Sequence, residues 1–156
     1  MTTQAALRFG LVGTGYWASE THAAGIADAA GADLAAVWGR NAAAADELAS
    51  RHGAVACTDF DEFLTHVDAV SFAVPPYVQA PLALRAAEAG KHLLLEKPIA
   101  LDEADGDRLV TAVADSGVAA LVFFTHLFSP PVLAWFDDVA DGSWLGGEAL
   151  WLGSAL

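Results

Sequence analysis

The chain has 156 residues and 55% hydrophobic content, which suits one domain with a sizeable core and leaves two complete domains cramped. Its formal net charge of −13 repels nucleic-acid phosphates and anionic membranes, so neither is an expected partner. No uncharged apolar stretch of about 18 residues is present to span a bilayer. The single cysteine, Cys57, cannot form an internal disulfide, and residues 1–6 do not resemble a signal peptide, so we expect a cytoplasmic protein.

Short apolar segments alternate with helical segments along most of the chain. The expected strands are residues 7–12, 34–38, 68–74, 92–95 and 118–124. The expected helices are residues 16–30, 41–51, 58–66, 78–89 and 102–116, with N-caps at Asn41, at Thr58 or Asp59, and at Asp102. Because the strands are continuously apolar, they predict an α/β fold whose parallel sheet is doubly wound, buried on both faces and joined by right-handed crossovers.

The last part of the chain has a weaker pattern. Residues 132–139 predict a helix, residues 142–147 a turn-rich segment, and residues 148–152 the start of another strand. We therefore place one domain at residues 1–128, and a connecting helix with the start of a truncated second domain at residues 129–156. Trp135, Trp144 and Trp151 either form a surface that a following domain or partner covers, or pack in an ordinary core.

A glycine motif follows the first expected strand and opens the first expected helix. It reads Gly13-Thr14-Gly15-Tyr16-Trp17-Ala18 and fits the G-x-G-x-x-G/A pattern of dinucleotide-binding turns. Gly13 permits the tight turn, Gly15 lets a pyrophosphate approach the backbone, and Ala18 lets the helix pack closely on the strand. The helix N-terminus offers N–H groups and a positive dipole end to the phosphates. These features predict a Rossmann-type domain at residues 1–128, the alternative being a plain strand–helix turn without a ligand.

The end of the second expected strand bears on the choice of dinucleotide. An acidic residue there would bind both ribose hydroxyls and repel a 2′-phosphate. This chain has Gly39-Arg40-Asn41 at that place, so Gly39 leaves room for the phosphate and Arg40 can pair with it. The segment favours NADP over NAD, unless Arg40 is a solvated surface charge.

Two further segments carry a family resemblance. Residues 69–76 read Ala-Val-Ser-Phe-Ala-Val-Pro-Pro, and residues 89–98 read Ala-Gly-Lys-His-Leu-Leu-Leu-Glu-Lys-Pro. Together with the glycine turn, they resemble the N-terminal domain of the Gfo/Idh/MocA oxidoreductases, the glucose–fructose oxidoreductase and inositol dehydrogenase family. The resemblance runs from about residue 7 to about residue 152.

The resemblance implies roles for particular residues. Lys97 would be catalytic, donating a hydrogen bond to the substrate oxygen and stabilising negative charge during hydride transfer. Glu96 would contact the nicotinamide ribose or hold Lys97, and Pro98 would follow a cis peptide bond. The cofactor groove would be lined by Val74, Pro75 and Pro76.

The chain departs from the family pattern at several places. Gln79 holds a position where the family usually has a histidine, and we still count it as a cofactor contact. Leu127 stands where an arginine is common, while Thr125 is expected near the nicotinamide. For His126 a structural role is favoured over a catalytic one. The family's second domain carries the substrate pocket and the aspartate and histidine that partner the lysine, so no acid–base partner of Lys97 is assigned.

Three functions remain open from the sequence. The first is an oxidoreductase domain transferring hydride between NADP(H), or NAD(H), and a sugar, polyol or related secondary alcohol or ketone. The second is a dinucleotide-binding module without turnover, acting as a sensor or subunit. The third is a domain for another adenine nucleotide such as S-adenosylmethionine, against which Arg40 and the Glu-Lys-Pro segment argue. Whether the chain is truncated or naturally short, and whether it forms a homo-oligomer, also stay open.

Overall fold

The computed structural model describes residues 5–148 and residue 150. The chain divides into two compact units, Met1–Phe123 and Phe124–Leu156. The division falls earlier than the expected boundary after residue 128, because the 3-10 helix Thr125–Phe128 contacts α6 (Pro130–Ala140) in the second unit. Among the described residues, no helix combines the length and apolar character that a membrane span requires.

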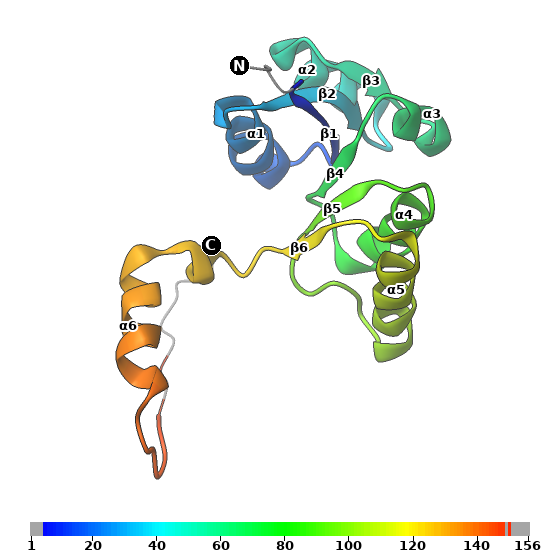
Figure 1. The fold of residues 1–156 in the computed structure, drawn as a ribbon. Helices are drawn as coiled ribbons and strands as arrows, with labels where there is room; N and C mark the ends of the chain where they lie inside the picture. Colours follow the sequence, from blue (N-terminus) through cyan, green and yellow to red (C-terminus); the bar gives the residue numbers. More distant parts are fainter. Residues whose placement is uncertain (1–4, 149, 151–156) are drawn as a thin grey trace. The chain divides into compact units, whose positions relative to one another are not determined.

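The first unit contains a six-stranded, wholly parallel sheet in its described residues, drawn in Figure 1. The strands are β1 Leu7–Val12, β2 Ala32–Trp38, β3 Val55–Cys57, β4 Ala69–Phe72, β5 His92–Leu95 and β6 Ala120–Val122. Their order across the sheet is β3-β2-β1-β4-β5-β6. The chain therefore winds outward from β1 on one side and then from β4 on the other, which is the Rossmann topology predicted from the sequence. A crevice for ligands is expected where the winding reverses, at the carboxyl ends of β1 and β4.

The helices of the first unit largely match the expected ones. They are a π-helix Ala18–Ala23, α1 Ala24–Asp28, α2 Ala42–His52, α3 Phe60–Thr65, α4 Pro76–Glu88 and α5 Glu103–Ser116. The side chains of Asn41, Asp59 and Asp102 accept backbone N–H bonds at the starts of α2, α3 and α5. Gly53 and Gly117 end α2 and α5 with φ of 67° and 65°, a conformation that favours glycine.

Five differences separate the observed elements from the expected ones. β3 was not expected, because three residues are too few to show a period. The last strand is confined to Ala120–Val122, and α4 begins two residues early because Pro76 suits a first helical turn. The helix after the glycine turn contains a π-helical segment where a regular α-helix was expected. Of the strand expected at residues 148–152, residues 149, 151 and 152 lie outside the described residues, and Glu148 and Leu150 are not in a strand.

Two apolar clusters pack on the two faces of the sheet. Leu11 and Val12 are adjacent in β1 and fully buried, yet they belong to different clusters, because successive side chains of a strand point to opposite faces. One cluster includes residues of α1 and α2, namely Ile26, Ala45, Leu48 and Ala49. The other includes residues of α3, α4 and α5, namely Phe60, Phe63, Ala83, Ala86 and Leu109. Cys57 is 2% exposed within the second of these, as a small apolar side chain.

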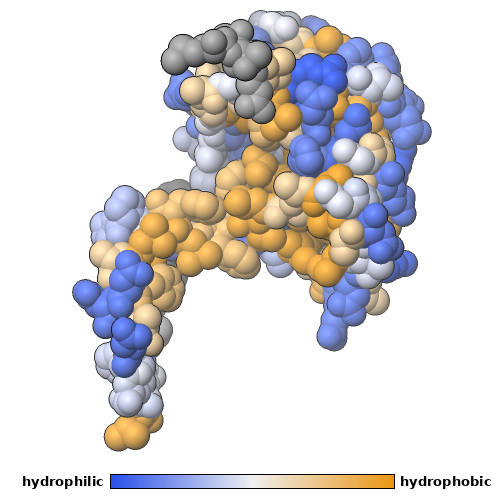
Figure 2. All heavy atoms as spheres, viewed as in Figure 1, coloured by the Kyte–Doolittle hydropathy of each residue, from blue (hydrophilic) through white to orange (hydrophobic). Residues whose placement is uncertain are grey.

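The second unit consists of a 3-10 helix, α6 and a following loop. Its aliphatic and phenylalanine side chains, which are among the orange residues of Figure 2, are largely exposed, and so are Trp135 at 58% and Trp144 at 66%. Trp144 donates its indole N–H to the carbonyl of Val139 at 2.9 Å, and both line a cavity of about 560 Å³ with Trp135. Neither ring is packed in an ordinary core. Trp151 lies outside the described residues.

Candidate functional site

The glycine turn lies at the carboxyl end of β1, and its two glycines have different surroundings: Gly13 is tightly packed and Gly15 is open. Gly13 has a φ of 128°, and a Cβ built on it would lie 2.5 Å from the carbonyl oxygen of Ala73, so a side chain there is excluded. A Cβ on Gly15 would meet nothing within 4 Å. Ala18 is fully buried where the helix leaves the turn. The turn thus packs tightly on the β4 side and leaves open space over Gly15, which is the arrangement that a pyrophosphate requires.

A cavity of about 300 Å³ lies over this turn. It is lined by Gly13, Thr14, Gly15, Trp38, Gly39, Arg40, Asn41, Ala73, Val74, Pro75 and Val78. Segments that follow β1, β2 and β4 therefore meet there, as the doubly wound topology demands. Most of the residues expected to bind the adenosine and phosphate part of a dinucleotide share this one cavity.

Gly39 has a packing role in addition to the one expected from the sequence. A Cβ on Gly39 would lie 2.7 Å from Cγ2 of Thr14, so a side chain at position 39 would require the side chain of Thr14 to move. An acidic residue at this position would therefore meet a steric contact with Thr14 in addition to repelling a phosphate. Arg40 is exposed beside it and is the cationic side chain of this cavity.

A second cavity, of about 450 Å³, is lined by Trp17, Ala73, Val74, Pro75, Glu96 and Lys97. It shares residues 73–75 with the first cavity, so the two adjoin at the segment that follows β4. Gly15, Arg40 and Lys97 consequently lie along one edge of the sheet. Both volumes are at the small end of the range for ligand sites, and together they suit an extended ligand.

Lys97 stands at the far end of this cleft, after β5. Its side chain is 62% exposed, and its Nζ lies 3.9 Å from Oε2 of Glu96. Its backbone N–H donates to the same oxygen at 3.2 Å. The Lys97–Pro98 peptide bond is cis, as the family resemblance implied. The ammonium is thus paired loosely enough to reach a substrate in the cavity.

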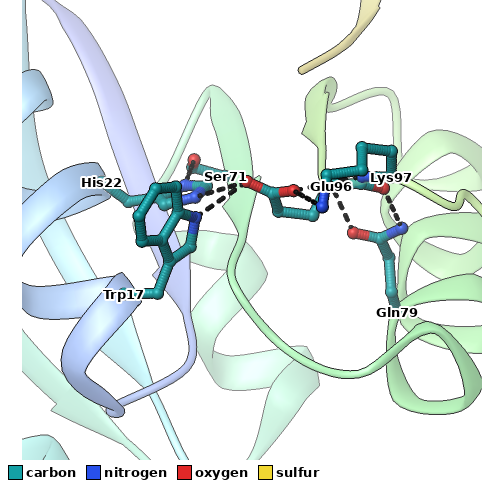
Figure 3. Close-up of polar contacts among 6 residues, drawn as sticks. All are labelled: Trp17, His22, Ser71, Gln79, Glu96 and Lys97. Atoms are coloured by element: carbon teal, nitrogen blue, oxygen red, sulfur yellow. Dashed lines mark hydrogen bonds and ion pairs between the residues drawn. The ribbon is translucent and has the colours of Figure 1, made fainter. Parts of the chain in front are cut away.

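Glu96 connects this end of the cleft with the helix of the glycine turn, as Figure 3 shows. Its Oε1 accepts the indole N–H of Trp17 at 2.8 Å and lies 3.4 Å from Nε2 of His22. On the far side of the imidazole, Nδ1 lies 2.8 Å from Oγ of Ser71 in β4. His22 and Ser71 were not expected in the site from the sequence. The one available signal was a histidine in the helix that follows the glycine turn, and it does not indicate which face the side chain takes.

Burial determines the protonation state of His22. The side chain is 2% exposed, and burial lowers the pKa of the imidazole below the ordinary value, while the hydrogen bond and charge of Glu96 partly offset this. His22 is therefore neutral at physiological pH.

Lowering the pH should destabilise the chain through His22. In the unfolded chain the imidazole takes up a proton near its ordinary pKa of about 6.5, while the folded chain resists it, so unfolding becomes easier as the pH falls. Between that pH and the lower folded pKa, the free energy of unfolding should decrease by up to about 1.4 kcal/mol per pH unit for this one proton. Urea unfolding between pH 8 and pH 5 should show the dependence in the wild type and a smaller one in His22→Gln, and equal slopes in the two would contradict it.

Gln79 does not reach the cleft surface. It is fully buried in α4, and its Oε1 accepts the backbone N–H of Glu96 at 2.9 Å. Its Nε2 donates to the carbonyl oxygens of Glu96, Pro98 and Ile99 at 2.8, 3.2 and 3.2 Å. In place of the direct cofactor contact expected from the sequence, Gln79 holds the backbone of residues 96–99 in position.

Gln79→Met should destabilise the fold by roughly 2–4 kcal/mol. The substitution keeps the volume but leaves an N–H and three carbonyl groups without this partner, at about 1–3 kcal/mol for each one that water cannot reach. Chemical unfolding of the full chain measures the loss, and Ser116→Ala, which removes a surface hydroxyl on α5, serves as the control. A loss below about 1 kcal/mol would show that the four groups find other partners.

Besides the buried Gln79, three expected site residues of the first unit, Tyr16, Pro76 and Pro98, line neither of these two cavities. Tyr16 is 81% exposed at the start of the helix and lines neither. Pro76 begins α4 next to the shared segment and lines neither. Thr125 belongs to the second unit, so it is described only as part of that unit's 3-10 helix.

Comparison with known proteins matches this chain to a family of oxidoreductases and to individual dehydrogenases and reductases. Residues 7–124 match the family described as an oxidoreductase family with an NAD-binding Rossmann fold. Inositol 2-dehydrogenase from Rhizobium meliloti (strain 1021) is 34% identical over 137 residues, which cover 87% of this chain and 41% of the relative. The crystal structure of GenD2 from gentamicin A biosynthesis, in complex with NAD, has a TM-score of 0.82 and 28% identity, covering 88% of this chain and 40% of that one. KijD10, a 3-ketoreductase from Actinomadura kijaniata solved with NADP and TDP-benzene, has a TM-score of 0.80 and 25% identity, covering 88% of this chain and 43% of that one.

This chain spans less than half of the length of each of these relatives. The matched residues 7–124 include the glycine turn, the six strands and the Glu96-Lys97-Pro98 segment. The resemblance inferred from the sequence is therefore confirmed: the chain belongs to the Gfo/Idh/MocA family of oxidoreductases, of which it contains the NAD(P)-binding Rossmann domain.

Proposed function

We propose that this chain binds NADP(H) as part of an oxidoreductase that transfers hydride to or from a secondary alcohol or ketone of a sugar, polyol or related compound. The observation that supports this best is the pair of adjoining cavities, which places Arg40, Gly15 and Lys97 along one edge of the sheet. A dinucleotide is an extended ligand with phosphates in its middle, so it suits a cleft with an open glycine turn between two cationic ends.

Each part of the cleft has a task in this proposal. The backbone around Gly15 receives the pyrophosphate, and Arg40 pairs with the 2′-phosphate beside Gly39 and Asn41. Val74 and Pro75 form the wall between the two cavities. Thr125, in the second unit, remains an expected contact of the nicotinamide end. When bound, the nicotinamide supplies the hydride acceptor or donor.

Lys97 acts on the substrate oxygen. Its ammonium donates a hydrogen bond to the hydroxyl or carbonyl and stabilises the negative charge that develops on that oxygen during hydride transfer. The carboxylate of Glu96, held by Trp17, keeps Lys97 at the rim of the cavity. A sugar or polyol as substrate follows from the kinds of relatives named above and from the secondary alcohol chemistry.

The proposal is tested by binding and by turnover in the same protein. Titration with NADPH and NADH should show tighter binding of NADPH, and the intact gene product should oxidise or reduce members of a panel of sugars, polyols and their ketones. Absence of binding to either dinucleotide would overturn the proposal. Binding without turnover by the intact gene product would favour the alternative, a dinucleotide-binding module that acts as a sensor or subunit.

Arg40→Ala should weaken NADPH binding by about 10- to 100-fold, because it removes charge-assisted hydrogen bonds that are worth about 1.5–3 kcal/mol. NADH lacks the 2′-phosphate, so its affinity should change by less than about threefold. Isothermal titration with both dinucleotides measures the two effects. Arg51→Ala, which removes an exposed arginine near the end of α2, is the control for net charge. An equal loss for both dinucleotides would remove Arg40 from the selection of NADP.

A further inference from the structure

A chain of polar contacts runs from the buried Ser71 in β4 through His22 and Glu96 to the exposed Lys97 (Figure 3). Ser71 Oγ lies 2.8 Å from Nδ1 of His22, and Nε2 of His22 lies 3.4 Å from Oε1 of Glu96. The other oxygen of Glu96, Oε2, faces the backbone N–H and the ammonium of Lys97. His22 lies in the π-helix, Ser71 in β4, and Glu96 in the loop after β5. Because these elements are far apart in the sequence, the arrangement is a product of the fold.

The distances select one tautomer of His22. A carboxylate oxygen can only accept hydrogen bonds, so Nε2 makes a favourable contact with Glu96 only when it carries the proton. Nδ1 then carries a lone pair and accepts the hydroxyl hydrogen of Ser71. A second proton on the ring is disfavoured by burial, which lowers the pKa of His22. The remaining neighbours are uncharged rings, Trp17 at 6.5 Å and Phe123 at 5.2 Å between ring centroids, so Glu96 is the charged group that faces the imidazole.

Serine, histidine and glutamate also compose hydrolytic triads, but the geometry here excludes that chemistry. Ser71 is 1% exposed in the middle of the sheet, so its hydroxyl cannot attack a substrate. Nδ1 of His22 contacts the Ser71 hydroxyl, while Nε2, on the opposite side of the ring, faces Glu96, which lines the second cavity. The chain of contacts therefore leads toward Lys97, the residue that lines the cavity.

We propose that His22, as the neutral Nε2–H tautomer held by Ser71, is a positioning residue that orients the carboxylate of Glu96 and through it Lys97. The proposal rests on the proposed function, in which Lys97 acts on the substrate. Trp17 and His22 both face Oε1, and this leaves Oε2 for Lys97. With His22 removed, only the indole of Trp17 still holds Oε1, so the carboxylate is less firmly oriented and the counter-charge beside the ammonium is less well fixed.

The tautomer is tested first, by a readout that does not depend on activity. Nitrogen-15 NMR of the imidazoles in the full chain identifies which ring nitrogen carries the proton, and the loss of signals in His22→Gln assigns them to His22. We expect protonation at Nε2 alone at pH 7.5. Protonation at Nδ1 alone, or at both nitrogens, would overturn the proposal.

The effect on Lys97 is tested by three variants in the intact gene product. His22→Leu should lower kcat by about tenfold or more while NADPH affinity changes by less than about threefold, since the cavity over the glycine turn is untouched. His22→Gln can still offer an N–H to Glu96 and should recover most of kcat. Ser71→Ala removes the donor to Nδ1, favours the protonated ring, and should move the acid limb of the kcat profile to higher pH.

The outcomes separate this proposal from the proposed function. Unchanged kcat in His22→Leu, or an equal loss in His22→Leu and His22→Gln, would overturn the positioning role. A wild-type protein that binds NADPH without turnover would contradict the oxidoreductase function. In that case the indole N–H resonance of Trp17, identified with Trp17→Phe, still decides whether His22 orients Glu96. Both variants lose the ring current of the imidazole, but only His22→Leu also loses the N–H that faces Glu96, so the resonance should shift further in His22→Leu than in His22→Gln. Equal shifts in the two variants would overturn the proposal.

Discussion

Gly15→Asp is expected to raise the dissociation constant for NADPH and for NADH by about 100-fold or more without unfolding the chain. A Cβ at this position meets nothing within 4 Å, so the side chain is accommodated and projects into the space proposed for the pyrophosphate. It would displace two or more phosphate hydrogen bonds of about 1.5 kcal/mol each and add like-charge repulsion. Titration with both dinucleotides measures the loss, and thermal unfolding of the ligand-free protein confirms the fold.

Two matched variants make this result specific. Gly25→Asp adds the same charge at an exposed glycine of α1 that also has open space around it, so dinucleotide affinity should change by less than about threefold. Gly13→Ala should instead damage the fold by about 3 kcal/mol or more, because the residue has a φ of 128° and its Cβ would meet a backbone carbonyl. Wild-type affinity in Gly15→Asp would place the phosphates elsewhere and refute the cleft assignment.

Lys97→Met is expected to lower kcat of the intact gene product by about 100- to 1000-fold, as for the loss of one group that stabilises charge in the transition state. Methionine keeps an unbranched side chain of nearly the same length without the charge, so NADPH affinity should change by less than about threefold. Steady-state kinetics with the best substrate of the panel separate kcat from KM. A rise in KM alone would mean that Lys97 binds substrate without acting in the transition state.

Arg108→Ala provides the control for the lost positive charge. Arg108 is exposed on α5, where it pairs with Asp105, and it does not line the cleft. Its removal should leave kcat and NADPH affinity unchanged within about twofold. A loss comparable to that of Lys97→Met would point to net charge rather than to the position of one ammonium.

Features that depend on neighbouring residues were predicted well from the sequence. Asn41 and Asp102 cap their helices because the cap bonds reach only two or three residues along the chain. The parallel sheet followed from continuously apolar strands alternating with helices, and the glycine turn followed from its place between the first strand and helix. The Glu96-Lys97-Pro98 segment is different, because its role came from family resemblance and not from its physical chemistry alone.

Features that depend on residues far apart were not predictable in this way. Gln79 was expected to touch a cofactor, yet it is fully buried and bonds the backbone of residues 96–99. The sequence could not show this, because helix periodicity does not tell which polar side chain faces a loop. The close packing of Gly39 against Thr14 also required the two turns to be placed side by side. The π-helix shifts the face on which His22 lies, and no local pattern in the sequence indicates such an insertion.

The sequence by itself therefore determined the α/β class, the dinucleotide-binding turn and the cationic residues that could serve a cofactor, since each depends on periodicity or on adjacent residues. Only the tertiary structure decided that Ser71, His22 and Glu96 meet, that Gln79 supports the Lys97 loop, and that the two cavities adjoin at residues 73–75. The physical reason is that crossover connections bring distant strand ends to one edge of the sheet, where hydrogen bonds and close packing are set by three-dimensional contact and not by spacing along the chain.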